Sequence, residues 1–354
     1  MKANLVQLKS FFEEHGTILI LIVPLFLIAA GTSLFGSTLT IRIVINMYIN
    51  LILVLGLQLF MGNGGILNFS HIGFMGIGAY ASVIFSMTPQ AKSIGIPDLY
   101  SFLNPIHVPF IVSLFAGGII AAAIAAIISF PLMRLSDAAA VITSFALLVI
   151  IHVVLVHWNS ITNGPQTLFG VDRYTELWPT AILGILFVFI AYWFKESSFG
   201  LMLRASRDDR YAAATSGINI IHMRWIAFVV SAFMAGVSGG LWAHFVTSFS
   251  PKAFYLTETF VILAMLVVGG PGGVSGAVVG TLAVTIVREG LRSIESAINI
   301  GQMMSNTLVG FTEVFLAVAL IVILIFRPLG IMGGQEIRWP KKALRLTKTT
   351  HHDK

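Results

Sequence analysis

The chain has 354 residues, of which 57% are hydrophobic and only 10% are charged, and its mean hydropathy is +0.92. A soluble domain carries roughly a quarter charged residues, so this composition excludes a water-soluble protein and indicates a chain that lies mostly in lipid. The absence of cysteine excludes disulfides and thiolate metal sites. The basic residues behind the net charge of +6 lie at the ends of apolar runs, which argues against a nucleic-acid-binding face.

The apolar runs predict an all-α, polytopic integral membrane bundle of about ten transmembrane helices, because about 20 residues cross the hydrocarbon core. The first run follows Lys2 and Lys9 and has the form of a signal peptide, but in so polytopic a chain we interpret it as an uncleaved first span. Residues 254–290 hold two short candidates, which leaves two full crossings or a re-entrant hairpin open. We place the spans near residues 17–35, 43–61, 66–87, 106–130, 138–157, 178–194, 222–246, 254–268, 274–290 and 306–326.

The distribution of basic residues predicts the orientation. If the N-terminus lies inside, fifteen Lys and Arg residues fall in inner segments and six in outer segments, and the positive-inside rule places the richer side in the cytoplasm. A single crossing at 254–290 would move the basic residues after Arg327 to the outside. We therefore expect both termini to be cytoplasmic, with a single transmembrane domain over residues 1–330 and a basic cytoplasmic tail over residues 331–354.

Two glycine-rich segments interrupt the spans, GNGGILNFSHIGFMGIGAY at 62–80 and GGPGGVSGAVVG at 269–280. Glycines let helices approach closely, and interrupted helices in the two halves of a transporter indicate a substrate pathway. Packing alone explains the glycines equally well, but the polar residues of the first segment favour a pathway, because polar groups at membrane depth usually face a cavity or the bundle interior. The predicted pathway residues are Asn63, Gly64, Gly65, Asn68, Ser70, His71, Gly76, Gly78, Gly269, Gly270, Gly272, Gly273 and Glu313.

Two carboxylates lie within or at the edge of predicted spans. Such residues are functional candidates by default, although many are simply paired inside the bundle. We include Glu313, inside the last span, in the predicted pathway, and we leave the roles of Glu313 and of Glu258 open.

Motifs for catalysis are absent from the sequence. GIGAYA at 76–81 fits a dinucleotide-binding pattern, but it lies in an uncharged membrane run without the strand, helix and acidic partner that the pattern requires. No phosphate-binding loop of the type GxxxxGK[ST], no HExxH and no GxSxG occurs. We therefore expect no catalytic residue, no metal site and no cofactor in this chain.

A charged connection at residues 195–224 is the clearest cytoplasmic element. Ser206 followed by Asp209 forms a capping box, alanines follow, and Gly217 is a natural left-handed stop, so a helix of about ten residues is expected. A mere connector is the alternative, but connectors between spans are usually short and uncapped. We interpret the element as a docking site made by Arg207, Asp208, Asp209, Arg210, Ala212, Ala213 and Gly217.

This connection resembles a known family. AAATSG at 212–217 resembles the coupling-loop core of bacterial ABC importer permeases, although Tyr211 stands where the general motif has glutamate. FGLMLRASRDDRYAAATSGIN at 199–219 and both glycine-rich segments are similar to the LivM-type permeases of branched-chain amino acid uptake systems, and the likeness covers most of residues 40–330.

The resemblance implies a multi-pass permease subunit in the bacterial cytoplasmic (inner) membrane that forms the translocation pathway for branched-chain or related amino acids. It implies a sister permease subunit, two cytoplasmic ABC ATPase subunits that use the ATP, and an extracytoplasmic solute-binding protein. The docking residues would then couple the chain to an ATPase. Whether the two permeases are identical is left open.

Two other functions fit parts of the sequence. Broken helices and intramembrane carboxylates also suit a self-sufficient secondary transporter or channel, but the capped cytoplasmic helix and the scarcity of charge in the spans argue against it. An ABC permease for urea or short amides is a further alternative, because the external binding protein largely sets the specificity of such systems.

Overall fold

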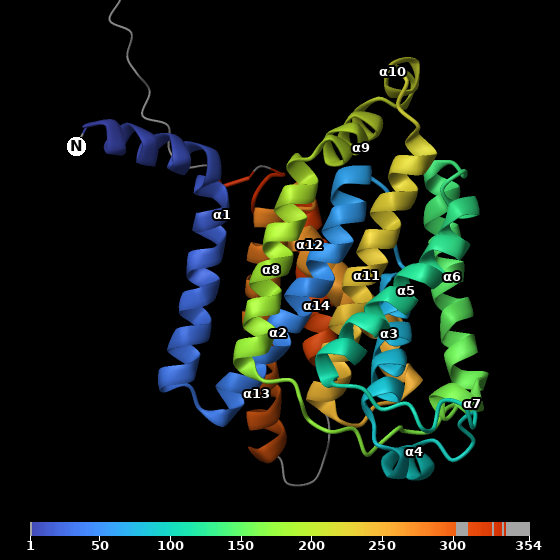
Figure 1. Cartoon of the computed structure of the whole chain (residues 1–354). Helices are drawn as coiled ribbons and strands as arrows, with labels where there is room; N and C mark the ends of the chain where they lie inside the picture. Colours follow the sequence, from blue (N-terminus) through green and yellow to red (C-terminus); the bar gives the residue numbers. More distant parts are fainter. Residues whose placement is uncertain (1, 302–310, 328, 335, 338–354) are drawn as a thin grey trace, which may run out of the picture.

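The computed structural model describes residues 2–301, 311–327, 329–334 and 336–337. Long α-helices run side by side through a bundle, and short helices lie at its two ends (Figure 1). The long helices are α1 (Lys2–Phe35), α2 (Thr38–Leu57), α3 (His71–Ser86), α5 (Phe110–Leu132), α6 (Asp137–His157), α8 (Leu177–Glu196), α11 (Ile220–Val246), α12 (Leu256–Gly269), α13 (Val274–Gly301) and α14 (Phe311–Phe326). The short ones are the π-helix η1 (Gln58–Gly62), α4 (Pro89–Gly95), α7 (Asn159–Thr162), α9 (Ser198–Asp208), α10 (Arg210–Thr215) and the 3₁₀-helix η2 (Pro251–Phe254).

The described helices confirm the predicted polytopic all-α fold. Eight helical segments among the described residues are long and apolar enough to cross a membrane. α3 and α14, with 16 residues each, occupy the third and tenth predicted spans. The third span begins later than expected because residues 65–70 are not helical, so the predicted interruption in the first glycine-rich segment is present.

Residues 251–269 and 274–295 are each long and apolar enough to cross a membrane, and the turn between α12 and α13 lies against Gly62, which Arg207 of α9 contacts; this favours two crossings over a re-entrant hairpin at residues 254–290. At its start α12 lies beside the last turns of α6, where the rings of His152 and Tyr255 stack with their centres 4.0 Å apart. At its end, the amide of Met332 donates to the carbonyl of Gly269 over 3.0 Å. α12 has only 14 residues, about 21 Å of helix, and η2 extends it to the length of a candidate span.

Glycines hold the centre of the bundle together by letting α3, α5 and α11 come into backbone contact. Gly78 on α3 lies against Gly236 on α11, and Gly117 on α5 lies against the carbonyl oxygen of Gly78. A methyl group at any of these positions would meet backbone atoms, so no larger residue permits the same approach. The packing interpretation of Gly78 is therefore confirmed, and its role in a substrate pathway stays a prediction.

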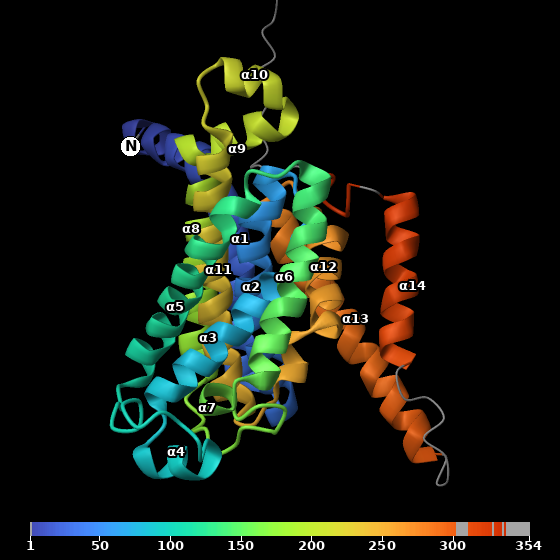
Figure 2. The ribbon, with the colours of Figure 1, turned by 90° about the vertical axis from the view of Figure 1, so that its right-hand side faces the viewer.

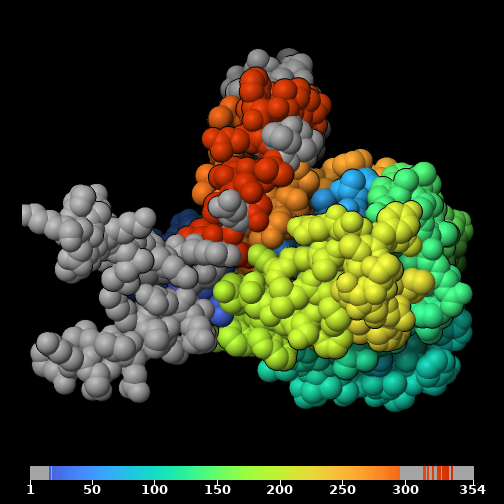
Figure 3. Space-filling model, turned by 90° about the horizontal axis from the view of Figure 1, so that it is seen from above, coloured from blue at the N-terminus to red at the C-terminus, as the bar shows by residue number. Residues whose placement is uncertain are grey.

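The two ends of the bundle differ. α9 and α10 project from one end, where α1 also begins, whereas α4 and α7 lie at the opposite end (Figures 1 and 2). Seen from above, α9 and α10 cover part of the face at their end of the molecule (Figure 3). We refer to these as the α10 end and the α4 end.

Single cysteines test the predicted orientation, because the chain contains no native cysteine. Tyr211, 85% exposed at the α10 end, and Gln166, exposed in the connection between α7 and α8, mark the two sides. An impermeant maleimide should label Gln166→Cys in intact cells and Tyr211→Cys only after permeabilisation. Labelling of Tyr211→Cys in intact cells would contradict a cytoplasmic α10 end.

Candidate functional site

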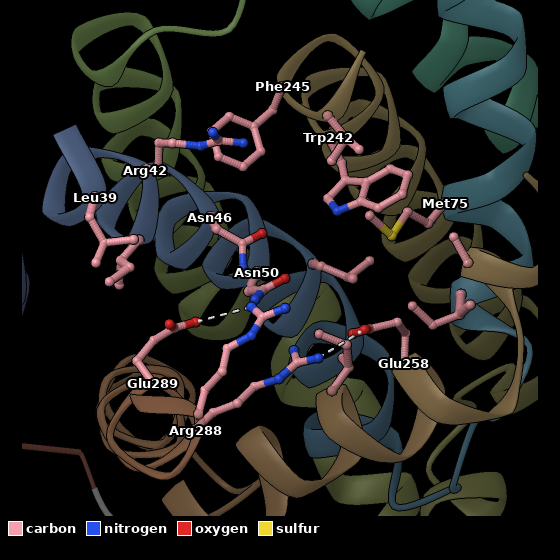
Figure 4. Close-up of a pocket in the computed structure, with 17 residues that line it drawn as sticks. Leu39, Arg42, Asn46, Asn50, Met75, Trp242, Phe245, Glu258, Arg288 and Glu289 are labelled. Carbon is pink, nitrogen blue, oxygen red and sulfur yellow. Dashed lines mark hydrogen bonds and ion pairs between the residues drawn. The ribbon is translucent and has the colours of Figure 1, made fainter. Parts of the chain in front are cut away.

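A cavity of about 450 Å³ lies between α2, α3, α11, α12 and α13 (Figure 4). On α2 it extends from Leu39, in the first turn, to Leu53, a helix length of about 21 Å. α2 begins at the end of the bundle away from α10 (Figure 1). The cavity therefore occupies the half of the bundle nearer the α4 end, which the basic-residue distribution predicts to be extracytoplasmic.

The cavity brings charged side chains of α12 and α13 opposite apolar side chains of α3 and α11 (Figure 4). Nη2 of Arg288 lies 3.1 Å from Oε1 of Glu258, which joins α13 to α12. Nη1 of Arg292 lies 3.9 Å from Oε1 of Glu289, one turn away on the same helix. The polar lining consists of Arg42, Asn46, Asn50, Glu258, Arg288, Glu289 and Arg292.

Asn50 is the most deeply placed polar side chain of this lining. It is only 7% exposed, and no other described residue forms a hydrogen bond with its amide. Its amide atoms are not among the fully buried polar atoms that lack a partner, so the amide opens into the cavity. Asn50 therefore presents a donor and an acceptor to whatever fills the cavity.

The predicted pathway residues whose side chains the structure describes do not line this cavity, but His71 lies directly behind its wall. Nε2 of His71 is 2.8 Å from the carbonyl oxygen of Leu53, a lining residue, and Nδ1 is 3.2 Å from Oγ of Ser231. Ser70 donates from its backbone N–H and from Oγ to Oδ1 of Asn68, over 3.0 and 2.7 Å. These polar groups thus have partners inside the protein, and their role in a pathway stays a prediction.

The remaining pathway residues lie at helix contacts and at the α10 end. Gly76 on α3 packs against Phe254 and Leu155. Asn63 is buried and donates from Nδ2 to the carbonyl of Leu59 over 2.9 Å. The side chain of Glu313, on α14, lies outside the described residues. Gly269 ends α12, and Gly270, Gly272 and Gly273 lie in the turn to α13; these glycines of the second segment contact residues 276, 280, 329, 333, 334 and 336.

Arg207 connects the predicted docking element to the first glycine-rich segment. Its Nη1 donates to the carbonyl oxygen of Gly62 over 2.7 Å, and its aliphatic stem covers Gly65, where a Cβ would lie 2.5 Å from Cγ of Arg207. Gly65 also has a φ of +74°, which favours glycine. Gly62 in turn lies against the carbonyl of Pro271 in the α12–α13 turn. α9, η1 (which continues α2) and this turn therefore meet at the α10 end.

The prediction of one ten-residue docking helix is wrong, because the helix is interrupted at Asp209. Ser206 lies inside α9, where its buried Oγ donates to the carbonyl of Leu203 over 2.7 Å, so it does not begin a helix. Asp209 is extended, and its Oδ1 accepts from the N–H groups of Tyr211 and Ala212 over 2.9 and 3.0 Å. The side chain of Asp209 thus caps a separate six-residue helix, α10.

The exposed residues of the α9–α10 segment lie at the tip of the α10 end (Figure 1). Gly217 has a φ of +83°, which confirms the predicted left-handed stop. Ala213 is buried, so it fixes α10 in place and does not face outward. The predicted docking residues on the surface are Arg207, Asp208, Asp209, Arg210, Ala212 and Gly217.

Glu336 is a further structural residue of this end that the sequence did not indicate. Its carboxylate accepts from the N–H groups of Val274 and Ser275, over 2.8 and 2.9 Å, at the start of α13. It also forms an ion pair with Lys195, the two side chains being 8% and 6% exposed. Burial alone would raise the pKa of Glu336, but the charge of Lys195 and the hydrogen bonds from Lys195 and Ser275 outweigh it and hold this pKa below its ordinary value.

Removing one partner of this ion pair should destabilise the protein more than removing both. A buried charge left alone costs about 3–5 kcal/mol, whereas two apolar replacements leave no unpaired charge. Thermal unfolding in detergent should therefore give a lower Tm for Glu336→Ala than for Glu336→Ala with Lys195→Met. Because the folded-state pKa is lowered, this stabilisation is complete above the ordinary glutamate pKa of about 4.3 and is lost as the pH falls through the folded-state value. Equal Tm values for the two variants would contradict the ion pair.

Comparisons with known proteins agree with this architecture. Residues 39–326 match the family described as branched-chain amino acid transport system / permease component. The high-affinity branched-chain amino acid transport system permease protein LivM of Escherichia coli is 24% identical over 345 residues, which cover 88% of this chain and 74% of the relative.

Other relatives carry different names. The nucleoside ABC transporter permease protein NupC of Lactococcus lactis is 27% identical over 59% of this chain and 68% of the relative. The ribose import permease protein RbsC of Haemophilus influenzae is 27% identical over 37% of this chain and 42% of the relative. No solved structure matches the chain. Since the family match covers most of the chain, the protein belongs to the permease components of branched-chain amino acid transport systems.

Proposed function

We propose that this chain is a permease subunit of a bacterial ABC importer, in the cytoplasmic membrane, that carries branched-chain or related amino acids. Its partners are a sister permease, two cytoplasmic ATPase subunits and an extracytoplasmic solute-binding protein. The chain itself is a transport subunit without a catalytic site, and its partners use the ATP.

The contact of Arg207 with Gly62 is the observation that carries the proposal. It joins an exposed segment, α9–α10, to η1, which continues α2, and through Gly62 to the α12–α13 turn. α2 and α13 also line the cavity. An ATPase that moves the α9–α10 segment therefore has a continuous path of contacts to the helices around the cavity, which is what coupling of hydrolysis to transport requires.

The proposed cargo rests on the share of this chain that each relative covers. The LivM relative covers 88% of the chain, whereas the ribose permease covers 37%, and this difference favours amino acids. The nucleoside permease, which covers 59% of the chain, supports a nucleoside as the second candidate. Urea or short amides remain a third.

Reconstitution with candidate partners tests the proposal. A single cysteine at Tyr211 should crosslink to an ATPase subunit, and one at Gln166, at the α4 end, should not. In liposomes, uptake should require the ATPase, ATP and a binding protein. A leucine-loaded binding protein should stimulate ATP hydrolysis. Stimulation only by a nucleoside-loaded protein would overturn the cargo, and uptake by the chain alone would make it a self-sufficient carrier.

A further inference from the structure

The cavity near the α4 end presents both signs of charge, and these charges have unused bonding capacity. A guanidinium carries five N–H donors and a carboxylate accepts about four hydrogen bonds. Arg288 and Glu258 use one contact with each other, at 3.1 Å, and their side chains are 21% and 34% exposed. Both reach into the cavity (Figure 4), so a ligand can bind to them without breaking their ion pair.

The second pair is looser and adds to the same surface. Arg292 and Glu289 are 3.9 Å apart, at the limit of an ion pair. Arg292 is 73% exposed and Glu289 is 25% exposed. The first pair bridges α12 and α13, but this pair lies within one helix and contributes little to holding the helices together. Its charges are therefore free to meet a ligand.

The opposite side of the cavity is apolar. Trp242 on α11 and Met75 on α3 line it. Asn50 lies on α2, and its side-chain amide opens into the cavity (Figure 4). A ligand that fills the cavity thus meets opposite charges, an amide and an apolar surface together.

We propose that the cavity is a binding site for a zwitterionic α-amino acid with an apolar side chain. Arg288 and Arg292 bind the carboxylate, Glu258 and Glu289 bind the ammonium group, and the side chain packs against Trp242. The volume of about 450 Å³ lies in the range of small-molecule sites. The inference rests on the proposed importer function and adds a substrate site within the permease itself.

The charges favour this ligand class over the other candidate cargoes. An α-amino acid carries adjacent opposite charges that match the paired glutamates and arginines. Ribose and nucleosides carry no charge, so their hydroxyl groups can form hydrogen bonds with these side chains but cannot offer them the opposite charges that an α-amino acid does.

Protection of a single cysteine measures binding directly. Asn46 is a half-buried lining residue on α2, so Asn46→Cys in the full chain, in membrane vesicles, reports on access to the cavity. L-leucine should slow its reaction with a maleimide several-fold, with no effect on Gln166→Cys. Leucinol, which lacks the carboxylate, and 4-methylpentanoate, which lacks the ammonium group, should each need about tenfold higher concentration or more. Equal protection by ribose or uridine, or no protection by leucine, would overturn the site.

Exchanging the charges separates binding from a structural role. Glu258→Arg with Arg288→Glu keeps an ion pair between α12 and α13 but reverses its direction, and it should weaken leucine protection about tenfold. Glu258→Gln, a milder change, should weaken it in the same direction. Unchanged protection in both variants would leave these residues as a helix clamp only. Crosslinking of Tyr211→Cys to an ATPase tests the importer function independently, so either proposal can fail alone.

Discussion

Replacing Gly78 by leucine should destabilise the bundle by about 3 kcal/mol, the upper end of the cost of overpacking. The new side chain would meet the backbone of Gly236, on the neighbouring helix α11, and backbone atoms cannot rotate away as a side chain can. The Tm of the purified protein and the monodisperse fraction after detergent extraction should both fall.

Gly31→Leu is the matched control for this prediction. Gly31 lies on α1, and a Cβ there would meet nothing within 4 Å. The same residue type is thereby introduced into another long helix without a clash. If Gly31→Leu lowers the Tm and the monodisperse fraction as much as Gly78→Leu does, the loss of stability does not come from a clash between α3 and α11.

Replacing Arg207 by alanine should lower ATP-driven uptake about tenfold or more while leaving the amount of inserted protein unchanged. The change removes a charged hydrogen bond to Gly62, worth about 1.5–3 kcal/mol, and uncovers Gly65. Since Arg207 lies at the α10 end, outside the helix contacts of the bundle centre, folding should persist. Uptake per inserted complex, with ATP hydrolysis measured in parallel, gives the result.

Arg204 offers a control on the same helix. Its Nη1 lies 3.7 Å from Glu196, whose side chain is 51% exposed, and such surface pairs contribute little. Arg204→Ala should therefore keep uptake close to that of the unaltered protein. A loss as large as that of Arg207→Ala would mean that the charge of α9, and not the contact with Gly62, matters.

The fold could be predicted from the sequence because hydropathy and span length are local properties. The capping of α10 was misassigned for a local reason as well. Ser206 and Asp209 fit a capping box, but the helix before them continues through Ser206, so Asp209 alone acts as the cap. A pattern of two residues does not reveal which of two adjoining helices ends first.

The cavity could not be predicted, because its charges come from distant segments. In the sequence, Arg42 and Arg288 are two of the six basic residues of the predicted outer segments, and Glu258 is a carboxylate at the edge of a predicted span. Their convergence depends on how α2, α12 and α13 pack, which no local pattern encodes. Conversely, the polar residues Asn68 and His71 suggested a cavity, but they form hydrogen bonds within the protein.

The position of Glu336 late in the chain determines when the first turn of α13 can form all its contacts during synthesis. The N-terminal turn of α13 receives its carboxylate from a residue 62 positions later in the chain. Because a chain leaves the ribosome from its N-terminus, the N–H groups of Val274 and Ser275 lack this hydrogen-bond acceptor until α14 has been made. The turn between α12 and α13 is therefore among the last parts of the described fold to close. A nascent chain that stops before Glu336 contains all the long helices but lacks the hydrogen bonds from Val274 and Ser275 to this carboxylate.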